Sequence, residues 1–312
     1  AAREAAGTSE VCAMTEIGRL LTAMVTPFRA DGSVDYDQAG ELAKALLASG
    51  SDGIVLTGTT GETPTLSIEE QVEVWRAVRR AVGPDATLVG GASTNSTSES
   101  LEMVTQGADA GMSALMFTVP YYNKPPQEGL FRHFRTLAEA TPLPCILYNI
   151  PGRTSLNVTA ETTLRLAREV PNIVGIKEAS GDMAQVGAIV DGAPEGFRVW
   201  SGDDSAAVDI VERGGWGVIS VASHLVGRQI SAMLAAAAAG QIEEARRLEA
   251  GLTPLFNVLF IETNPIPVKF ALNHVGFRVG GLRLPMIEAS EAAQAKVSAE
   301  LAKHQVDLPI PV

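Results

Sequence analysis

One lysine stands at the end of an apolar, β-branched run, where a charged side chain is uncommon. Lys177 follows Val174 and Ile176 in the segment IVGIKE. A buried strand has no packing use for an ammonium group, and burial favours the neutral amine, which is the nucleophilic form. Lys177 is therefore a candidate nucleophile for Schiff-base chemistry on a carbonyl substrate. The alternative for this segment alone is a lysine that enters solvent where its strand ends.

A tyrosine occupies a comparable place in the preceding apolar run, CILYN. Alternation puts Ile146 and Tyr148 on one face, and Ile173, Gly175 and Lys177 on one face of the next run. Neighbouring strands lie about 4.8 Å apart, so the Tyr148 hydroxyl would approach the amine if both faces are interior. Such a phenol can shuttle protons during carbinolamine formation and dehydration. The alternative is a core tyrosine with a satisfied hydroxyl.

Two further segments could bind anions. The small-residue loop Thr57–Glu62 (TGTTGE) could surround a carboxylate with backbone N–H groups, beside the hydroxyls of Thr59 and Thr60. Arg153 follows Gly152 and could hold a second carboxylate in a bidentate manner. The alternatives are an ordinary turn and a surface arginine. These segments predict an anionic substrate.

Other polar residues are weaker candidates for a catalytic or metal-binding role. The adjacent tyrosines Tyr121 and Tyr122 lie in a proline-stiffened loop and are more typical of an interface than of catalysis. Asp203 and Asp204 suggest a metal site, but adjacent side chains diverge and Asp commonly caps helices. No HExxH, CxxC or GxGxxG motif is present, and the histidines lack metal-ligand spacing. We therefore expect neither a metal nor a cofactor.

Composition limits the class of protein. The chain has 312 residues, 46% of them hydrophobic, and a net charge of -12, which argues against a nucleic-acid partner. No apolar stretch reaches the roughly 18 residues that a membrane span requires. Cys12 and Cys145 are expected to form no structural disulfide, and the expected location is the cytoplasm. Ala1–Ala13 lacks periodicity and is expected to be an upstream extension.

Short apolar runs alternate with helical patterns, and eight such pairs can be counted. This alternation is typical of parallel strands joined by helices, and the count favours a (β/α)8 barrel over an open, doubly wound sheet with about six strands. Ser67 and Glu70 form the expected N-terminal capping box of one helix. The predicted strands are Leu21–Thr26, Gly53–Leu56, Ala86–Gly90, Ala114–Phe117, Cys145–Asn149, Ile173–Lys177, Arg198–Ser201 and Gly217–Ser220.

The predicted organisation is an α/β TIM barrel with a C-terminal helical appendage. Residues 1–17 are assigned to a flexible extension, 18–228 to the catalytic barrel and 229–312 to C-terminal helices. The helices predicted in that last part are Gln229–Ala239, Ile242–Leu259, Pro267–Val275 and Ala289–His304.

Four segments resemble one enzyme family in their order and spacing. They are GTTGE at 58–62, PYYNKPPQEG at 120–129, LYNIPGRT at 147–154 and GIKEASGD at 175–182. The chain resembles the dihydrodipicolinate synthases, of the N-acetylneuraminate lyase-like class I aldolase superfamily. The similarity runs from about Leu20 to Met286 or beyond, including the segments SGDD, GVISV, NPIPVKFAL and LRLPM.

The resemblance implies roles for the candidate catalytic residues. Lys177 would form an imine with pyruvate, and Tyr148 would relay protons together with Thr59 and Tyr122. In the family, the tyrosine that matches Tyr122 comes from a neighbouring subunit. The resemblance also implies a homotetramer, in which Tyr122 reaching across subunits would make assembly necessary for activity.

It further implies how the two substrates bind. Thr60 would bind the carboxylate of pyruvate, and Arg153 the carboxylate of L-aspartate-4-semialdehyde. Gly202 and Ile219 would line the pocket. The pyruvate enamine would attack the semialdehyde, and cyclisation would give 4-hydroxy-tetrahydrodipicolinate for lysine and diaminopimelate biosynthesis.

Two other readings stay open at this point. An N-acetylneuraminate lyase or a 2-keto-3-deoxy sugar-acid aldolase would share the lysine, the tyrosine and the carboxylate loop. Arg153 within GRT and Tyr122 within PYYN favour the synthase. A catalytically silent barrel that binds an anion is the remaining alternative.

Feedback inhibition by lysine is expected to be weak or absent. Asn95, Glu99 and Tyr121 match the interfacial site of lysine-sensitive members, but Ile68 and Gln71 replace histidines found in some of them. Ile68 cannot form a hydrogen bond with an amino acid. An activity titration with lysine checks this expectation, and strong inhibition at sub-millimolar lysine would contradict it.

Overall fold

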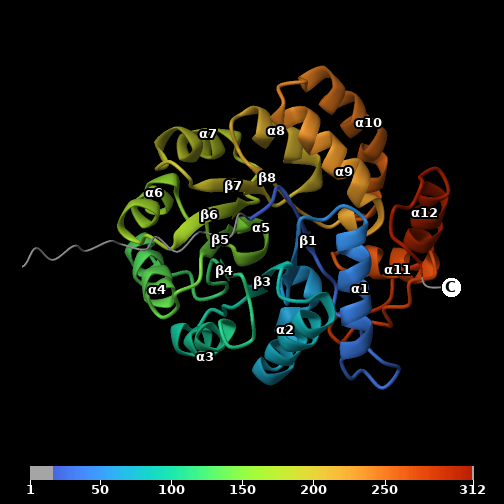
Figure 1. The fold of residues 1–312 in the computed structure, drawn as a ribbon, viewed down its shortest axis with the longest axis horizontal. Coiled ribbons are helices and arrows are strands. Elements are labelled where there is room, and N and C mark those ends of the chain that lie inside the picture. Colours follow the sequence, from blue (N-terminus) through green and yellow to red (C-terminus); the bar gives the residue numbers. More distant parts are fainter. Residues whose placement is uncertain (1–16, 311–312) are drawn as a thin grey trace, which may run out of the picture.

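Eight parallel strands form a closed barrel in a computed structural model that describes residues 17–310 (Figure 1). The strands follow one another around the barrel in sequence order, and β1 pairs with β8. The prediction of a (β/α)8 barrel is confirmed. The strands are β1 Leu20–Ala23, β2 Gly53–Leu56, β3 Thr87–Gly91, β4 Ala114–Thr118, β5 Cys145–Asn149, β6 Ile173–Glu178, β7 Arg198–Ser201 and β8 Gly217–Ser220.

Helices surround the barrel on its outside (Figure 1). The predicted capping box of α2 is present: the Ser67 hydroxyl accepts from the Glu70 N–H, and the Glu70 carboxylate accepts from the Ser67 N–H. The helices before β8 are α1 Tyr36–Ala48, α2 Ile68–Val82, α3 Thr97–Gly107, α4 Gln127–Glu139, α5 Pro151–Thr154, α6 Ala160–Glu169, α7 Met183–Gly192 and α8 Ala207–Glu212. The short 3₁₀ turns are η1 Thr59–Gly61, η2 Thr63–Thr65 and η3 Asp204–Ala206.

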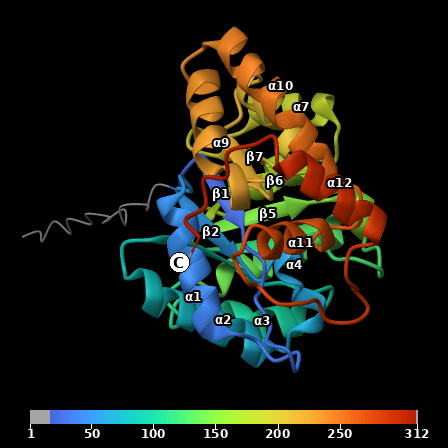
Figure 2. The ribbon, with the colours of Figure 1, turned by 90° about the vertical axis from the view of Figure 1, so that its right-hand side faces the viewer.

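The helix after β8 packs on both the barrel and the C-terminal helices. Helix α9, Ser223–Ala238, packs on α8, α1 and β1 of the barrel and on α10 and α11 of the C-terminal part, and it begins earlier than predicted. The predicted division at residue 228 falls inside this helix. We propose that the C-terminal extension begins with α10 and contains α10 Ile242–Val258, α11 Ile266–His274 and α12 Glu291–Leu301 (Figure 2).

Only Ile17 of the extension predicted for residues 1–17 lies within the described residues. Residues 1–16 of the predicted extension, Cys12 included, lie outside the described residues. Ile17, which was assigned to that extension, is buried in the core inside the barrel. Cys145 is a buried free thiol. Within residues 17–310, no helix combines the length and the apolar character needed to cross a membrane.

The barrel has an inner core and an outer core, as alternation along the strands requires. Inner side chains include Val55, Met116, Ile146 and Trp200, whereas the outer core joins the strands to the helices. The sequence predicted that Ile173 shares the inner face of β6 with Gly175 and Lys177. This prediction is wrong for Ile173, which packs in the outer core. The cause is a register shift, because Cys145 pairs with Ile173 but Ile146 pairs with Gly175.

The C-terminal extension is joined to the barrel by a buried ion pair. Lys269 of α11 donates to the Glu62 carboxylate at 2.6 Å and to the Gly281 carbonyl at 2.6 Å. The second carboxylate oxygen of Glu62 accepts from the Arg283 N–H at 3.1 Å. Burial lowers the pKa of Lys269, and the charge of Glu62 opposes that change. Glu62 directly follows η1, so this pair fixes the end of the loop after β2.

Removing one partner of this pair should destabilise the fold, because a buried charge would lose its compensation. Lys269→Met is expected to lower the free energy of unfolding by about 3–5 kcal/mol, measured by urea denaturation. The matched control is Lys303→Met, which removes an exposed lysine from its pair with Glu300 and should change stability little. Adding Glu62→Gln to Lys269→Met should recover part of the loss. Equal stability of Lys269→Met and the unchanged protein would contradict this account.

Candidate active site

The end of β6 directs two charged side chains to opposite sides of the barrel wall. Glu178 points outward, where its carboxylate accepts from the Asn149 side chain at 3.1 Å and from the Ser180 N–H at 2.7 Å. The Gln185 side chain adds a hydrogen bond at 3.0 Å. These bonds fix the outward residue, and alternation then directs Lys177 into the barrel.

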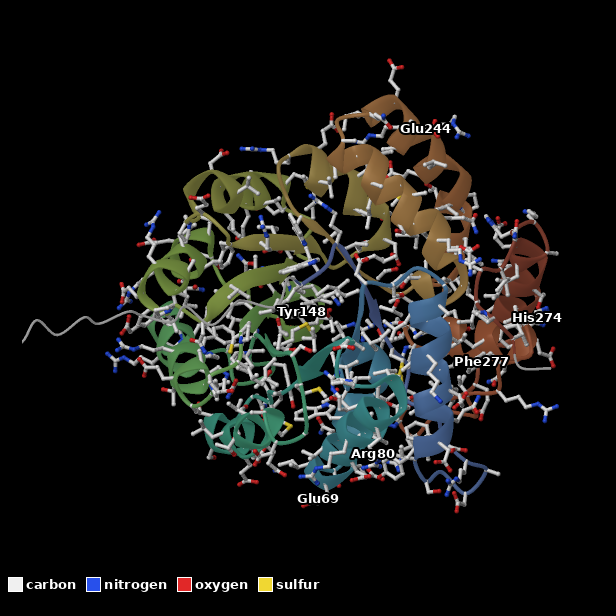
Figure 3. All side chains as sticks on the ribbon, viewed as in Figure 1. Glu69, Arg80, Tyr148, Glu244, His274 and Phe277 are labelled. Atoms are coloured by element: carbon white, nitrogen blue, oxygen red, sulfur yellow. The ribbon has the colours of Figure 1, made fainter. Side chains whose placement is uncertain are left out.

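Lys177 and Tyr148 meet inside the barrel, with the amine over the face of the tyrosine ring. They are paired residues of β6 and β5, and the Lys177 Nζ lies 4.3 Å from the centre of the Tyr148 ring. Both side chains are buried. Figure 3 places Tyr148 near the centre of the molecule, whereas the labelled Glu69, Arg80 and Glu244 lie at its edge.

Burial changes the acidity of both groups. It lowers the pKa of Lys177 to about 8; the charge of Asp204 opposes this change and that of Arg153 adds to it. Burial raises the pKa of Tyr148 to about 12, although a hydrogen bond with Thr59 and the charge of Arg153 oppose it. Near neutral pH, a useful fraction of Lys177 is therefore a free amine, and Tyr148 keeps its proton.

Two glycines make room around the lysine. A Cβ on Gly175 would lie 2.6 Å from the Trp200 ring, so this glycine admits the indole that fills the barrel beneath Lys177. A Cβ on Gly202 would lie 2.5 Å from the Ala179 Cβ and 3.2 Å from the Lys177 Cε. Gly202 thus lies beside the nucleophile. Ile219 is an inner-core residue of β8.

The loop after β2 turns back over the barrel mouth. Residues Thr59–Gly61 form η1, and the Thr26 hydroxyl donates to the Gly61 carbonyl at 2.7 Å. The first N–H groups of such a turn have no partner within it. Thr59 faces both the Tyr148 hydroxyl and a cavity, whereas Thr60 is buried and its hydroxyl accepts from Asn264 at 2.9 Å.

A cavity of about 260 Å³ opens at this mouth. Lys177 and Tyr148 do not line it, but Thr59, which forms a hydrogen bond with Tyr148, does. Arg153 lies at the rim, where its guanidinium donates to the Asn264 carbonyl at 3.1 Å. The lining residues are Thr57, Gly58, Thr59, Thr63, Pro64, Gly91, Ser93, Thr118, Tyr121, Ile150, Arg153 and Thr154.

The structure does not bring Tyr122 to the other candidate catalytic residues within this chain. Its side chain is 89% exposed, and its φ of 73° is uncommon for a residue other than glycine. The three candidate regulatory residues do lie together. The Asn95 side chain donates to the Tyr121 carbonyl at 3.1 Å, and the charge of Glu99 acts on the pKa of Tyr121.

Sequence reasoning missed the role of Asp204. It treated Asp203 and Asp204 as a cap or a metal site, and Asp203 does cap η3 through the Ser205 N–H at 2.9 Å. Asp204 is instead buried, and its carboxylate accepts from the N–H groups of Val221 and Ala222 at 3.1 and 2.9 Å. It is near enough to Lys177 to oppose the fall in the amine's pKa. The segment SGDD does not reveal which aspartate is buried.

Sequence reasoning also gave no role to Asn264, although it noted the segment NPIPVKFAL. Asn264 contacts both Thr60 and Arg153 across long sequence separations. Among residues 17–310, no group of three or more His, Cys, Asp or Glu side chains is placed to hold a metal ion. The residues that do gather here can form an imine, move protons and bind anions.

A family model, described as the dihydrodipicolinate synthetase family, matches residues 16–304. The chain belongs to this family. It is 52% identical to the 4-hydroxy-tetrahydrodipicolinate synthase of Dehalococcoides mccartyi, strain CBDB1, over 95% of this chain and 100% of the relative. It is also 52% identical to the synthase of Symbiobacterium thermophilum, over 94% of this chain and 100% of the relative.

Solved structures of family members have the same fold. The dihydrodipicolinate synthase of Aquifex aeolicus matches with a TM-score of 0.91 at 38% identity, over 95% of this chain and 100% of that chain. The family member of Cyanidioschyzon merolae, crystallised with lysine bound, matches with a TM-score of 0.90 at 43% identity, over 92% of this chain and 98% of that chain. The family resemblance inferred from the sequence is therefore confirmed.

Changing Asp204 should move the pH dependence of imine formation. Because the charge of Asp204 raises the pKa of Lys177, Asp204→Asn should lower that pKa further and shift the acid limb of kcat/KM for pyruvate to lower pH. The side-chain amide keeps an oxygen that can accept from Val221 or Ala222.

Asp203→Asn is the matched control, because it makes the same chemical change on the exposed neighbour and keeps a capping oxygen. Its acid limb should stay in place. An acid limb that moves to higher pH in Asp204→Asn, or moves equally in both variants, would contradict the assigned role of Asp204.

Proposed function

We propose that this chain is a 4-hydroxy-tetrahydrodipicolinate synthase, which condenses pyruvate with L-aspartate-4-semialdehyde through a Schiff base on Lys177. The buried Lys177 amine, 4.3 Å from the centre of the Tyr148 ring, carries this proposal. The relatives of this chain support the choice of substrates. Two that are 52% identical to it over nearly the whole chain are 4-hydroxy-tetrahydrodipicolinate synthases.

The first stage joins pyruvate to the enzyme. The lone pair of the Lys177 Nζ attacks C2 of pyruvate, and the carbonyl oxygen takes up a proton to give a carbinolamine. Loss of water then leaves an iminium between Nζ and C2. Tyr148 enters this stage protonated, as its raised pKa requires, and can deliver and recover a proton through its contact with Thr59.

The second stage makes the carbon–carbon bond and the ring. Loss of a proton from C3 converts the iminium into an enamine, whose C3 attacks the aldehyde carbon of the semialdehyde. The aldehyde oxygen becomes a hydroxyl group. The amino group of the semialdehyde then attacks C2, which closes the ring and expels the Lys177 amine. One water is released in the whole cycle, and there is no net oxidation or reduction.

The anionic groups of both substrates are assigned to the barrel mouth. Thr60 binds the carboxylate of pyruvate, close to Thr59 and Tyr148. Arg153, at the rim of the cavity, binds the carboxylate of the semialdehyde. Gly202 leaves space beside Lys177, and Ile219 contributes to the apolar wall within the barrel.

The exposed Tyr122 supports assembly as part of this proposal. In a homotetramer, Tyr122 of one subunit would complete the proton relay of its neighbour, and its exposure on this chain fits that role. The cytoplasmic location and the absence of a nucleic-acid partner stay predictions.

The role expected for lysine as an inhibitor also stays a prediction. Ile68 packs against the hydrophobic core, and Gln71 is buried with its side chain donating to the Leu66 carbonyl at 3.3 Å. Neither side chain is therefore available at the surface to donate a hydrogen bond to a bound lysine, as a histidine could. Asn95, Glu99 and Tyr121 remain the candidate regulatory residues.

Reduction in the presence of pyruvate tests the proposed nucleophile. Sodium borohydride with pyruvate should add one reduced pyruvate unit per chain, located by peptide mass mapping on Lys177. Lys177→Ala should take up none and should lose turnover. Tyr148→Phe should still be trapped at high pyruvate but lose turnover by roughly 10²- to 10⁴-fold, because the proton relay is broken.

Lys269 is an internal control in the same experiment, because it is also a buried lysine within an apolar segment. Its peptide should remain unmodified. Tyr36→Phe is the control for the tyrosine change and should keep full turnover. Adduct formation on a lysine other than Lys177, or turnover by Lys177→Ala, would show that the nucleophile is misassigned.

A further inference from the structure

One residue of the C-terminal extension contacts both candidate carboxylate-binding residues. Asn264 lies between α10 and α11, far along the chain from the loops of the barrel mouth. Its side-chain amide donates to the Thr60 hydroxyl at 2.9 Å, and its backbone carbonyl accepts from the Arg153 guanidinium at 3.1 Å. Asn264 thus connects two groups to which separate substrates have been assigned.

The contact between the Asn264 side chain and Thr60 determines which of the two groups donates the hydrogen bond. An amide NH₂ group only donates, so the Thr60 oxygen accepts and its own hydrogen is left for another acceptor. A carboxylate only accepts hydrogen bonds. Held in this way, Thr60 keeps its hydrogen available for donation to an anion.

The Asn264 side chain has Thr60 as its hydrogen-bond partner among the described residues. The side chain is buried, and its Oδ1 has no hydrogen-bond partner among the described residues. A half-satisfied buried amide costs free energy relative to an apolar side chain of similar size. The bond to Thr60 is therefore the contact that distinguishes this asparagine from an apolar side chain.

The loop is held to the extension at two points. The Asn264–Thr60 bond fixes the middle of η1, and the Lys269–Glu62 ion pair fixes the residue that follows η1. Lys269 and Asn264 both belong to the segment that leads into and forms α11. The position of Asn264 relative to Thr60 is therefore maintained by a separate, buried contact.

We propose that Asn264 is a positioning residue for the anionic end of pyruvate: its side chain sets Thr60 as a hydrogen-bond donor, and its backbone carbonyl holds Arg153 for the second substrate. This inference rests on the proposed function, because it assigns Thr60 and Arg153 to the carboxylates of pyruvate and of the semialdehyde. Asn264 itself acts through these residues and does not contact the reacting atoms.

The two contacts predict different effects on the two substrates. Asn264→Ala removes the side-chain contact but keeps the backbone carbonyl. It should raise the KM for pyruvate roughly tenfold, as expected for a weakened hydrogen bond to a charged group. The KM for the semialdehyde should stay within about twofold, because the Arg153 contact is retained.

Asn264→Asp is the sharper variant, because it has nearly the same shape and reverses the hydrogen bond. A carboxylate at this position accepts the Thr60 hydrogen and adds a negative charge near the pyruvate carboxylate. Its KM for pyruvate should therefore exceed that of Asn264→Ala. Asn257→Asp is the matched control: Asn257 is exposed on α10, and this change should leave both KM values unchanged.

A double-mutant cycle tests whether Asn264 acts through Thr60. Thr60→Val removes the hydroxyl and keeps the shape, so adding Asn264→Ala to it should raise the KM for pyruvate no further. Thermal melting of each variant reports its folding. If Asn264→Ala is unfolded, the nearly isosteric Asn264→Asp decides the question.

The inference is overturned if Asn264→Asp binds pyruvate as tightly as the unchanged protein, if both KM values rise equally in Asn264→Ala, or if the two changes in the cycle are additive. Failure of the proposed function is recognised separately, in the unchanged protein. If that protein forms no borohydride-trapped adduct with pyruvate, the synthase assignment fails whatever the Asn264 variants do, and the inference fails with it.

Discussion

The loss of water around a single amine is the constraint on which the rest of this site depends. An ammonium group on Lys177 would be costly inside the barrel, and this cost lowers its pKa to about 8. The surrounding structure keeps the amine there. Glu178 is fixed on the outside of the wall, and Trp200 fills the barrel beneath the lysine because Gly175 has no side chain. Tyr148 covers the amine with its ring.

Asp204 limits how far this effect goes. A buried amine without any anion nearby would lose its proton more completely, and the iminium that follows would then be a positive charge without compensation. The Asp204 carboxylate is held by backbone N–H groups of the segment after β8, so its position does not depend on Lys177. Burial raises the pKa of Asp204, and the N–H groups of Val221 and Ala222 oppose that change. When ionised, its carboxylate can stabilise the cation that the amine becomes.

Lys177 and Lys269 show what a sequence pattern can and cannot predict. Both lie within apolar segments, IVGIKE and IPVKFAL, and both are buried. Lys269 is paired with Glu62 at 2.6 Å and serves the structure, whereas Lys177 has the face of a tyrosine beside it. The pattern predicts burial in each case. The difference arises from which residues, distant in the sequence, meet each amine in space.

The same reason explains which parts of the fold could be predicted. Strand positions follow from local apolar runs, and β2, β5, β7 and β8 have the predicted bounds. The register shift that turns Ile173 outward depends on pairing with β5, which local alternation does not contain. Likewise, the meeting of Lys177 with Tyr148 followed from adjacent parallel strands, but the contact of Asn264 with Thr60 joins residues more than half the chain apart. No periodicity in the sequence indicates such a contact.

The most direct test of this account is the protonation equilibrium of the Lys177 amine in the free protein. Isotopically labelled lysine allows the chemical shift of each Cε to be followed by NMR as the pH is raised, and the signal of Lys177 is assigned by its absence in Lys177→Ala. The account predicts a midpoint at about 8. A midpoint at the ordinary lysine value of 10.5 would mean that the amine is solvated and charged, and the proposed chemistry would lose its basis.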